Sequence, residues 1–391
     1  MGLGGPMPMP GGPRKAPGLG PTGPKGPKPG GAGEGLGPLN DGIPRPCCIG
    51  IGAEDGRGPG AFVASPSSVP ISPGAEMYLQ LGLAIVSFVL LITIYLRLRL
   101  HSVKKRLLRV TTKLCELQRI CYETSAGAER SLRIEGCLRA SKQPSLQRLV
   151  RELDRLAKEY KFGEHVIHLA VTAILNAKNI SSDAHSPFVS GISQSVRQIW
   201  GYRQLFNRLD DIRQTQYDCN NTQHEAQLTN LWNALVPTES LPGRHGKHWS
   251  YIGFQGEDPA SDFRGMGLLG LYNLQYLSHE CGEEAQKLLL HSHHPSYGYS
   301  FAIMGINMTD LCLQLLRDGT ARTHFFNENS SIPTEQDFHH FYACVFIQFD
   351  SFWIDSKPDS IMNFSDIRTR FEMQLRRQLQ DPKAHLVLEH R

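Results

Sequence analysis

The residues with the clearest chemical potential lie at 249–277, in the sequence WSYIGFQGEDPASDFRGMGLLGLYNLQYL. The first half of this segment gathers glycine, aspartate, proline and one arginine, and the second half continues as an apolar helical pattern. Gly253 and Gly256 allow unusual backbone angles. Pro259 stiffens a turn, and Asp262 is placed to cap the following helix. We therefore expect an exposed, rigid loop held on a helical scaffold.

Other residues in and after this loop only imitate known sites. Gly265, Gly267 and Gly270 match the G-x-G-x-x-G dinucleotide fingerprint, but a polar loop precedes them where that fingerprint needs a strand. We interpret these glycines as positions of close helix packing. The later histidines and Cys281 lack the spacing of a zinc site, and no Walker lysine, G-x-S-x-G elbow or kinase signature is present. The sequence therefore predicts no metal, no cofactor and no self-contained active site.

Helices must position the loop, because the apolar residues around it recur three or four positions apart. No segment alternates convincingly as a strand. The predicted fold class is therefore all-α, a multi-helix domain that follows a single transmembrane helix and a disordered tail. The predicted amphipathic helices carry Leu146, Leu149, Val150, Leu153, Leu156, Ala157 and Tyr160; Leu228, Leu231, Trp232 and Leu235, ended by Pro237; Phe338, Phe341, Tyr342, Val345, Phe346, Phe349, Phe352 and Trp353, after a Thr334-x-x-Asp337 capping box; and Ile367, Phe371, Leu375 and Leu379, with Ser365 as N-cap.

Residues 77–96 form an uncharged run, MYLQLGLAIVSFVLLITIYL. At about 1.5 Å per residue this run matches a hydrocarbon core of about 30 Å, so we predict a transmembrane helix, with a buried core helix as the alternative. Basic residues follow it between Arg97 and Arg109, whereas residues 57–76 hold only one basic and one acidic side chain. This asymmetry predicts a lumenal N-terminal tail, a cytosolic C-terminal part, and contact between the basic flank and lipid headgroups. An endomembrane, with the endoplasmic reticulum favoured, is the expected location.

Composition indicates how the rest of the chain is divided. Glycine and proline make up about half of residues 1–76, which we expect to be disordered. The nine cysteines contain no C-x-x-C pair and are expected to be reduced. The sequence has no stripe of basic and aromatic residues that would indicate a nucleic-acid-binding surface.

Polar stretches between Ala184 and Asn221 interrupt the helical periodicity, so a domain boundary is expected there. We predict a basic juxtamembrane segment at 97–140, an N-terminal helical extension at 141–220 and the main domain at 221–391.

The loop strongly resembles the signature of the ELMO domain family, a Trp followed by Gly-Phe-Gln, Pro and Asp-Phe-Arg-Gly-x-Gly before a Leu-rich helix. Ser261 stands where the family pattern has Thr, which keeps the hydroxyl. The resemblance extends from about residue 115 to 375 and is to the short ELMO-domain-containing proteins. The matching residues are Trp249, Gly253, Phe254, Gln255, Asp258, Pro259, Asp262, Phe263, Arg264, Gly265 and Gly267, with further blocks at 115–122, 298–303 and 305–311.

The resemblance implies a GTPase-activating protein for Arf and Arf-like small GTPases, with Arg264 as the catalytic arginine supplied in trans. GTP hydrolysis spreads negative charge over the transferred phosphoryl group, and a guanidinium inserted from a partner can neutralise that charge. The partner would be the GTP-bound GTPase, contacted through Trp249, Phe254, Gln255, Asp258 and Asp262. Two alternatives stay open at this point.

In the first alternative, Arg264 is a structural residue paired with Asp258 or Asp262, and Trp249 and Phe254 are core anchors of the loop. In the second, the domain is a non-catalytic helical adaptor that docks a small GTPase or an exchange-factor complex. Spacing in the sequence does not separate these alternatives from the catalytic interpretation.

Overall fold

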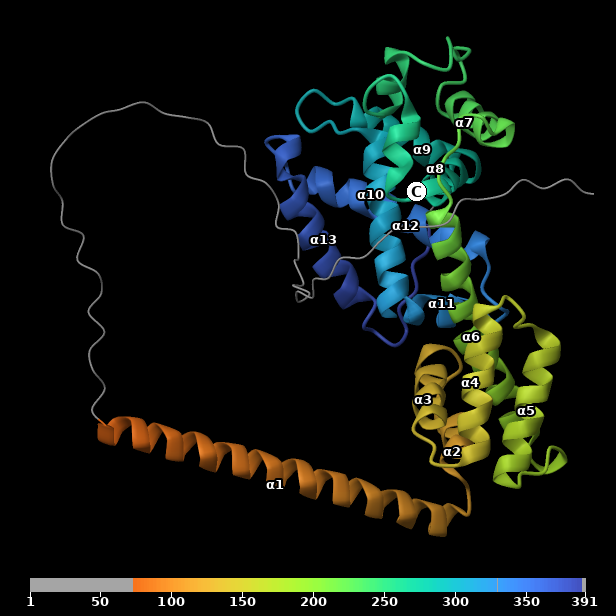
Figure 1. Ribbon diagram of the computed structural model, residues 1–391, viewed down its shortest axis with the longest axis vertical. Helices are drawn as coiled ribbons and strands as arrows, with labels where there is room; N and C mark the ends of the chain where they lie inside the picture. Colours follow the sequence, from red (N-terminus) through yellow and green to blue (C-terminus); the bar gives the residue numbers. More distant parts are fainter. Residues whose placement is uncertain (1–72, 329, 389–391) are drawn as a thin grey trace, which may run out of the picture. The chain divides into compact units, whose positions relative to one another are not determined.

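The computed structural model describes residues 73–328 and 330–388 of the chain (Figure 1). All regular structure in these residues is helical, and none of them forms a strand, which confirms the predicted all-α class. The elements are α1 (Pro73–Thr112), α2 (Glu116–Glu123), α3 (Ala128–Arg139), α4 (Pro144–Lys158), α5 (Glu164–Lys178), η1 (Asp183–His185), α6 (Ser186–Gln214), α7 (Thr222–Leu235), η2 (Lys247–Ile252), η3 (Pro259–Arg264), α8 (Gly267–Glu280), α9 (Gly282–Ser292), α10 (Phe301–Asp318), α11 (Arg322–Glu328), α12 (Glu335–Asp355), η4 (Ile361–Asn363) and α13 (Phe364–Gln378), where η marks 3-10 helices.

Helix α1 is longer than the predicted span of residues 77–96. It begins at Pro73, which fits the first turn because proline has no N–H to donate there, and it continues to Thr112 because lysine, arginine and leucine all favour helix. The part from Gln80 to Thr112 is long and apolar enough to cross a membrane. The predicted disorder of residues 1–76 falls almost entirely outside the described residues.

The strongest periodic patterns in the sequence form the expected helices. Helix α12 begins at Glu335 with the predicted capping box, in which Thr334 is the N-cap and Asp337 is the third helical residue. It buries its aromatic stripe, although Phe352 is only half-buried. Helix α7 buries all four residues of its predicted apolar face. Helix α4 buries Leu146, Val150, Leu153 and Ala157, whereas Leu149 and Leu156 are half-buried, and Tyr160 lies beyond the end of the helix and is exposed. The prediction of Ser365 as N-cap of the last helix is wrong, because the N-cap is Asn363, two residues earlier, and α13 begins at Phe364.

The expected interruption between Ala184 and Asn221 is also wrong. Helix α6 runs without a break through most of this stretch and packs against α3, α4 and α5 as well as α8 and α10. Figure 1 shows α6 passing from the side of α3, α4 and α5 to the side of α8 and α10. Its inward face is hard to recognise in the sequence because it includes Ser195 and Gln198, which are buried polar residues. The predicted boundary at residue 220 falls in the connection between α6 and α7.

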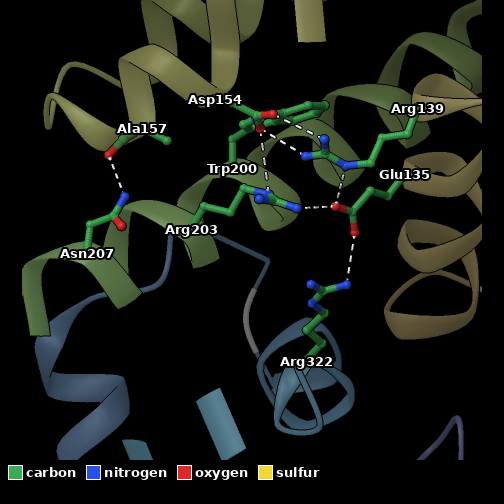
Figure 2. A network of polar contacts seen from close by, with 8 residues as sticks. All are labelled: Glu135, Arg139, Asp154, Ala157, Trp200, Arg203, Asn207 and Arg322. Atoms are coloured by element: carbon green, nitrogen blue, oxygen red, sulfur yellow. Dashed lines mark hydrogen bonds and ion pairs between the residues drawn. The ribbon is translucent and has the colours of Figure 1, made fainter. Parts of the chain in front are cut away.

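A buried ion-pair network ties the helices together around Glu135 of α3 (Figure 2). Its carboxylate accepts hydrogen bonds from Arg139 Nε at 3.0 Å and Arg203 at 2.7 Å, and Arg322 lies at 3.2 Å. Burial alone would raise the pKa of Glu135, but the hydrogen bonds from Arg203 and Arg139 and the charge of Arg322 lower it. The network therefore fixes α6 and α11 to α3.

We expect Glu135→Gln to lower the free energy of unfolding by about 3 kcal/mol, because three arginines lose a buried carboxylate. Glu129→Gln on the same helix is the matched control. Its exposed pair with Arg133, at 3.5 Å, should be worth less than about 1 kcal/mol. Denaturant unfolding followed by tryptophan fluorescence measures both, since all four tryptophans are buried.

The same measurement has a pH dependence with a defined sign. The folded pKa of Glu135 is lowered, so its contribution is complete above the unfolded value of about 4.3 and is lost as the pH falls through the folded pKa. The stability difference between wild type and Glu135→Gln should therefore be constant near neutral pH and shrink in acid. Equal losses for the Glu135 and Glu129 variants would contradict the role given to the network.

Candidate functional site

The polar loop is held to the helical scaffold at two points. The carbonyl oxygen of Gly253 accepts a hydrogen bond from the backbone N–H of Ile303, in the first turn of α10. At the other end, the N–H of Leu268 in the first turn of α8 donates to the carbonyl oxygen of Thr215, just after α6, at 2.9 Å. Both bonds satisfy N–H groups that a helix start leaves without an intrahelical partner. The loop is therefore anchored on three long helices.

The short helix η3 carries the arginine of the loop. Asp258 is its N-cap and accepts a hydrogen bond from the N–H of Ala260 at 2.9 Å, while Pro259 fixes the first backbone angle. Phe263 is fully buried and stacks on Tyr217 with 5.5 Å between ring centroids. One apolar residue of η3 is thus locked into the core immediately before Arg264.

Arg264 is exposed at the last position of η3. Its Nε donates to the carbonyl oxygen of Ser261 at 2.8 Å, which fixes the inner part of the guanidinium to its own helix. Within the described residues, the guanidinium forms no ion pair and no second hydrogen bond. The alternative in which Asp258 or Asp262 pairs with this arginine is therefore absent from the described structure. The two terminal nitrogens are available to an external anion.

A different arginine, Arg244, braces the loop. Its guanidinium pairs with Glu225 of α7 at 2.6 Å and with Asp258 at 2.9 Å, and it lies over the ring of Tyr217. Although burial acts in the opposite direction, the Ala260 amide and the guanidinium of Arg244 lower the pKa of Asp258. Sequence reasoning missed Arg244 because its two acidic partners lie 19 residues before it and 14 residues after it.

We expect Arg244→Met to lower the free energy of unfolding by about 2 kcal/mol, because Glu225 and Asp258 both lose a half-buried partner. Arg264→Met is the matched control within the same site. It removes an exposed side chain that forms no ion pair with the described residues, so the free energy of unfolding should change by less than about 0.5 kcal/mol. Thermal unfolding of the two variants side by side checks this, and equal losses would show that both arginines are structural.

Trp249 and Phe254, predicted as partner contacts, are buried and serve as core anchors. Trp249 is fully buried, donates from Nε1 to the carbonyl oxygen of Arg244 at 2.9 Å, and meets Trp232 and Phe254 edge-on. Both side chains therefore hold the loop in place.

The remaining predicted contacts lie on or near the surface. Gln255 is exposed, and its N–H donates to a carboxylate oxygen of Asp262 at 2.7 Å. The prediction that Asp262 caps the following helix is wrong, because α8 begins at Gly267 with Met266 at the N-cap position. Burial raises the pKa of Asp262, and the hydrogen bond from Gln255 partly offsets this effect. The hydrogen bond between Asp262 and Gln255 therefore links the two ends of the segment 255–262.

The glycines of the G-x-G-x-x-G pattern support packing, as predicted, but unequally. Gly267 has a positive φ of 50°, and a Cβ there would lie 2.2 Å from the carbonyl oxygen of Arg213. A Cβ on Gly265 would meet no atom within 4 Å.

Histidines near the loop have protein partners: His291 forms a hydrogen bond with the buried Asp350 at 2.7 Å, and His293 forms one with the carbonyl oxygen of Tyr251. These histidines are structural.

Comparison with known proteins places the loop in a family. Residues 207–368 match the ELMO/CED-12 family model, from the end of α6 to the start of α13. ELMO domain-containing protein 2 of Mus musculus is 41% identical over 289 residues, which cover 73% of this chain and 94% of that protein. ELMO domain-containing protein 1 of Homo sapiens is 38% identical over 307 residues, with coverages of 72% and 89%. ELMO domain-containing protein B of Dictyostelium discoideum is 34% identical over 277 residues, with coverages of 71% and 94%.

Proposed function

Because the chain belongs to the ELMO/CED-12 family, we propose that it activates GTP hydrolysis by an Arf or Arf-like small GTPase. In this proposal Arg264 enters the nucleotide site of the GTP-bound partner, and the chain has no active site of its own. The observation that carries the proposal is an exposed guanidinium at the end of a braced loop, which forms no ion pair with any described residue.

The chemistry follows from the charge that develops during hydrolysis. Negative charge spreads over the transferred phosphoryl group, and a guanidinium can bridge two of its oxygens. An arginine that is already paired would have to break that pair first, whereas Arg264 uses only its Nε within the described residues. Because η3 is fixed by Asp258 and Phe263, little conformational freedom has to be lost when the partner binds.

Single-turnover GTP hydrolysis by a panel of Arf and Arf-like proteins tests the proposal, with the full chain in lipid nanodiscs. We expect at least one member of the panel to be accelerated by about a thousandfold. Absence of acceleration across the panel, with binding of the GTP form retained, would replace the activator with the adaptor interpretation. Absence of both binding and acceleration would contradict the activator and the adaptor interpretations alike.

We further propose that α1 anchors the chain in an endomembrane, with the endoplasmic reticulum favoured, the N-terminal tail lumenal and the ELMO domain cytosolic. The supporting observations are the apolar stretch of α1 before Arg97, the exposed side chains of that stretch and the basic residues from Arg97 onward. Confinement of both proteins to one membrane would raise their effective concentration.

Protease treatment of sealed microsomes from cells that express the full chain tests this topology. We expect residues C-terminal to α1 to be digested without detergent and the tail to be protected. Protection of the C-terminal domain would reverse the orientation. Extraction of the whole chain by alkaline carbonate would show that α1 does not span the membrane.

A further inference from the structure

The buried residue Arg119 of α2 has no partner among the residues that the structure describes. Its side chain lies in a helix of eight residues, Glu116–Glu123, and only 9% of the residue is exposed. Its Nε is completely buried without a hydrogen bond, and no ion pair or side-chain hydrogen bond of Arg119 is formed within the described part of the chain. A buried charge without a partner is costly, and most buried polar groups in proteins are satisfied. The position therefore calls for an external ligand.

Neighbouring arginines show what a structural role looks like in this domain. Arg139 donates to Glu135 and Asp154, and Arg130 donates to the carbonyl oxygen of Thr124 at 2.7 Å. Each of these side chains has an acceptor supplied by the chain itself. Arg119 differs from them by lacking any such acceptor among the described residues.

Arg119 lines a cavity of about 980 Å³ formed by α2, α3, the end of α5 and the basic end of α1. Seven lysine and arginine side chains line this cavity, against two glutamates. One glutamate, Glu116, is already paired with Lys105 at 2.8 Å, and the other, Glu123, is exposed. Burial raises the pKa of the Cys137 thiol in the wall to about 11, so this thiol is neutral and does not offset the positive charge.

We propose that this cavity binds a phosphate group, with Arg119 as its central ligand. The guanidinium suits phosphate because its planar fork can donate to two oxygens at once, and Lys178 supplies further positive charge in the same wall. This inference does not depend on the proposed action of Arg264, which lies in a different part of the domain.

The phosphate could be carried by an anionic lipid headgroup or by a soluble molecule. Along α1, the first residue of the cavity wall is Lys104, eight positions after the end of the predicted span at residue 96. Eight helical residues correspond to about 12 Å along an untilted helix, and the headgroup layer on one side of a bilayer fills about 5 to 8 Å of that distance. Two arms of one experiment distinguish these sources.

The experiment uses the full chain in a neutral detergent and measures its melting temperature and binding isotherms. One arm adds dioctanoyl phosphatidylinositol phosphate, with dioctanoyl phosphatidylcholine as the neutral lipid control, and the other adds inorganic phosphate. We expect the phosphorylated lipid to raise the melting temperature and to bind about thirtyfold more weakly to Arg119→Gln. Arg148→Gln is the matched control, since Arg148 is exposed on α4 and outside the cavity.

The unliganded variants separate a ligand site from a structural arginine. If Arg119 is a phosphate ligand, the Arg119→Gln variant without ligand should be as stable as wild type or more stable, because an unpaired buried charge is removed. Binding of inorganic phosphate with equal loss in Arg119→Gln would support a soluble source, and binding of the lipid alone would support the membrane. A destabilised Arg119→Gln, or no binding of either probe by wild type, would overturn the proposal.

Discussion

Replacement of Arg264 by alanine is expected to reduce the stimulated rate of GTP hydrolysis by about a thousandfold while the protein remains folded. The side chain is exposed and has one local hydrogen bond, from Nε to the Ser261 carbonyl oxygen, so its loss should leave the loop intact. The stimulated rate depends on it much more strongly, because the guanidinium acts where negative charge develops on the transferred phosphoryl group.

Arg264→Lys sharpens this prediction. Lysine keeps a positive charge at the same place but lacks the planar fork, and it cannot reproduce the hydrogen bond from Nε that orients the arginine. We therefore expect the lysine variant to lose most of the stimulation as well. Long-range electrostatic attraction alone would be retained by lysine, so full activity of this variant would contradict the bidentate role.

Single-turnover kinetics at saturating activator, together with the dissociation constant for the GTP-bound partner, check both variants. An interaction formed mainly in the transition state lowers the rate constant and leaves ground-state binding nearly unchanged. Arg244→Met provides the comparison, because it should reduce both stability and activity through the loop. If the Ala variant accelerates hydrolysis as well as wild type, another residue supplies the charge.

The elements that were predicted from the sequence are those whose stabilisation is local. Helix α12 carries a capping box and eight regularly spaced apolar residues. Both features involve residues only three or four positions apart in the sequence. The position of Arg264 on an exposed loop also follows from local composition, because glycine and proline favour a turn. Such features need no knowledge of the rest of the fold.

The features that were missed depend on partners far away in the sequence. The buried polar side chain of Gln198 makes α6 appear interrupted, yet it donates to the carbonyl oxygen of Phe326, 128 positions later. Arg322 is 187 positions from Glu135, and no spacing rule connects the two. Asp262 looked like a helix cap because it precedes an apolar helical pattern, but its carboxylate accepts a hydrogen bond from the N–H of Gln255, seven positions earlier.

Two glycines of the loop allow a sharp test of how the site is held. Gly253 and Gly256 both have positive φ, at 84° and 75°. A Cβ on Gly253 would lie 2.2 Å from the backbone nitrogen of Phe301, whereas a Cβ on Gly256 would meet nothing within 4 Å. Alanine at either position must adopt a left-handed conformation, which costs about 1 kcal/mol, but only the first substitution also collides with the start of α10.

We expect Gly256→Ala to cost about 1 kcal/mol and Gly253→Ala about 4 kcal/mol or more, because backbone atoms of α10 cannot move aside as a flexible side chain could. Denaturant unfolding measures the two losses, and their difference isolates the steric clash. Gly253→Ala should also lower the stimulated hydrolysis rate, since the displaced loop carries η3, whereas Gly256→Ala should keep it. Similar losses in both variants would mean that the bond between Gly253 and Ile303 does not fix the loop, and the rigidity on which the role of Arg264 depends would have to come from Asp258 and Phe263 alone.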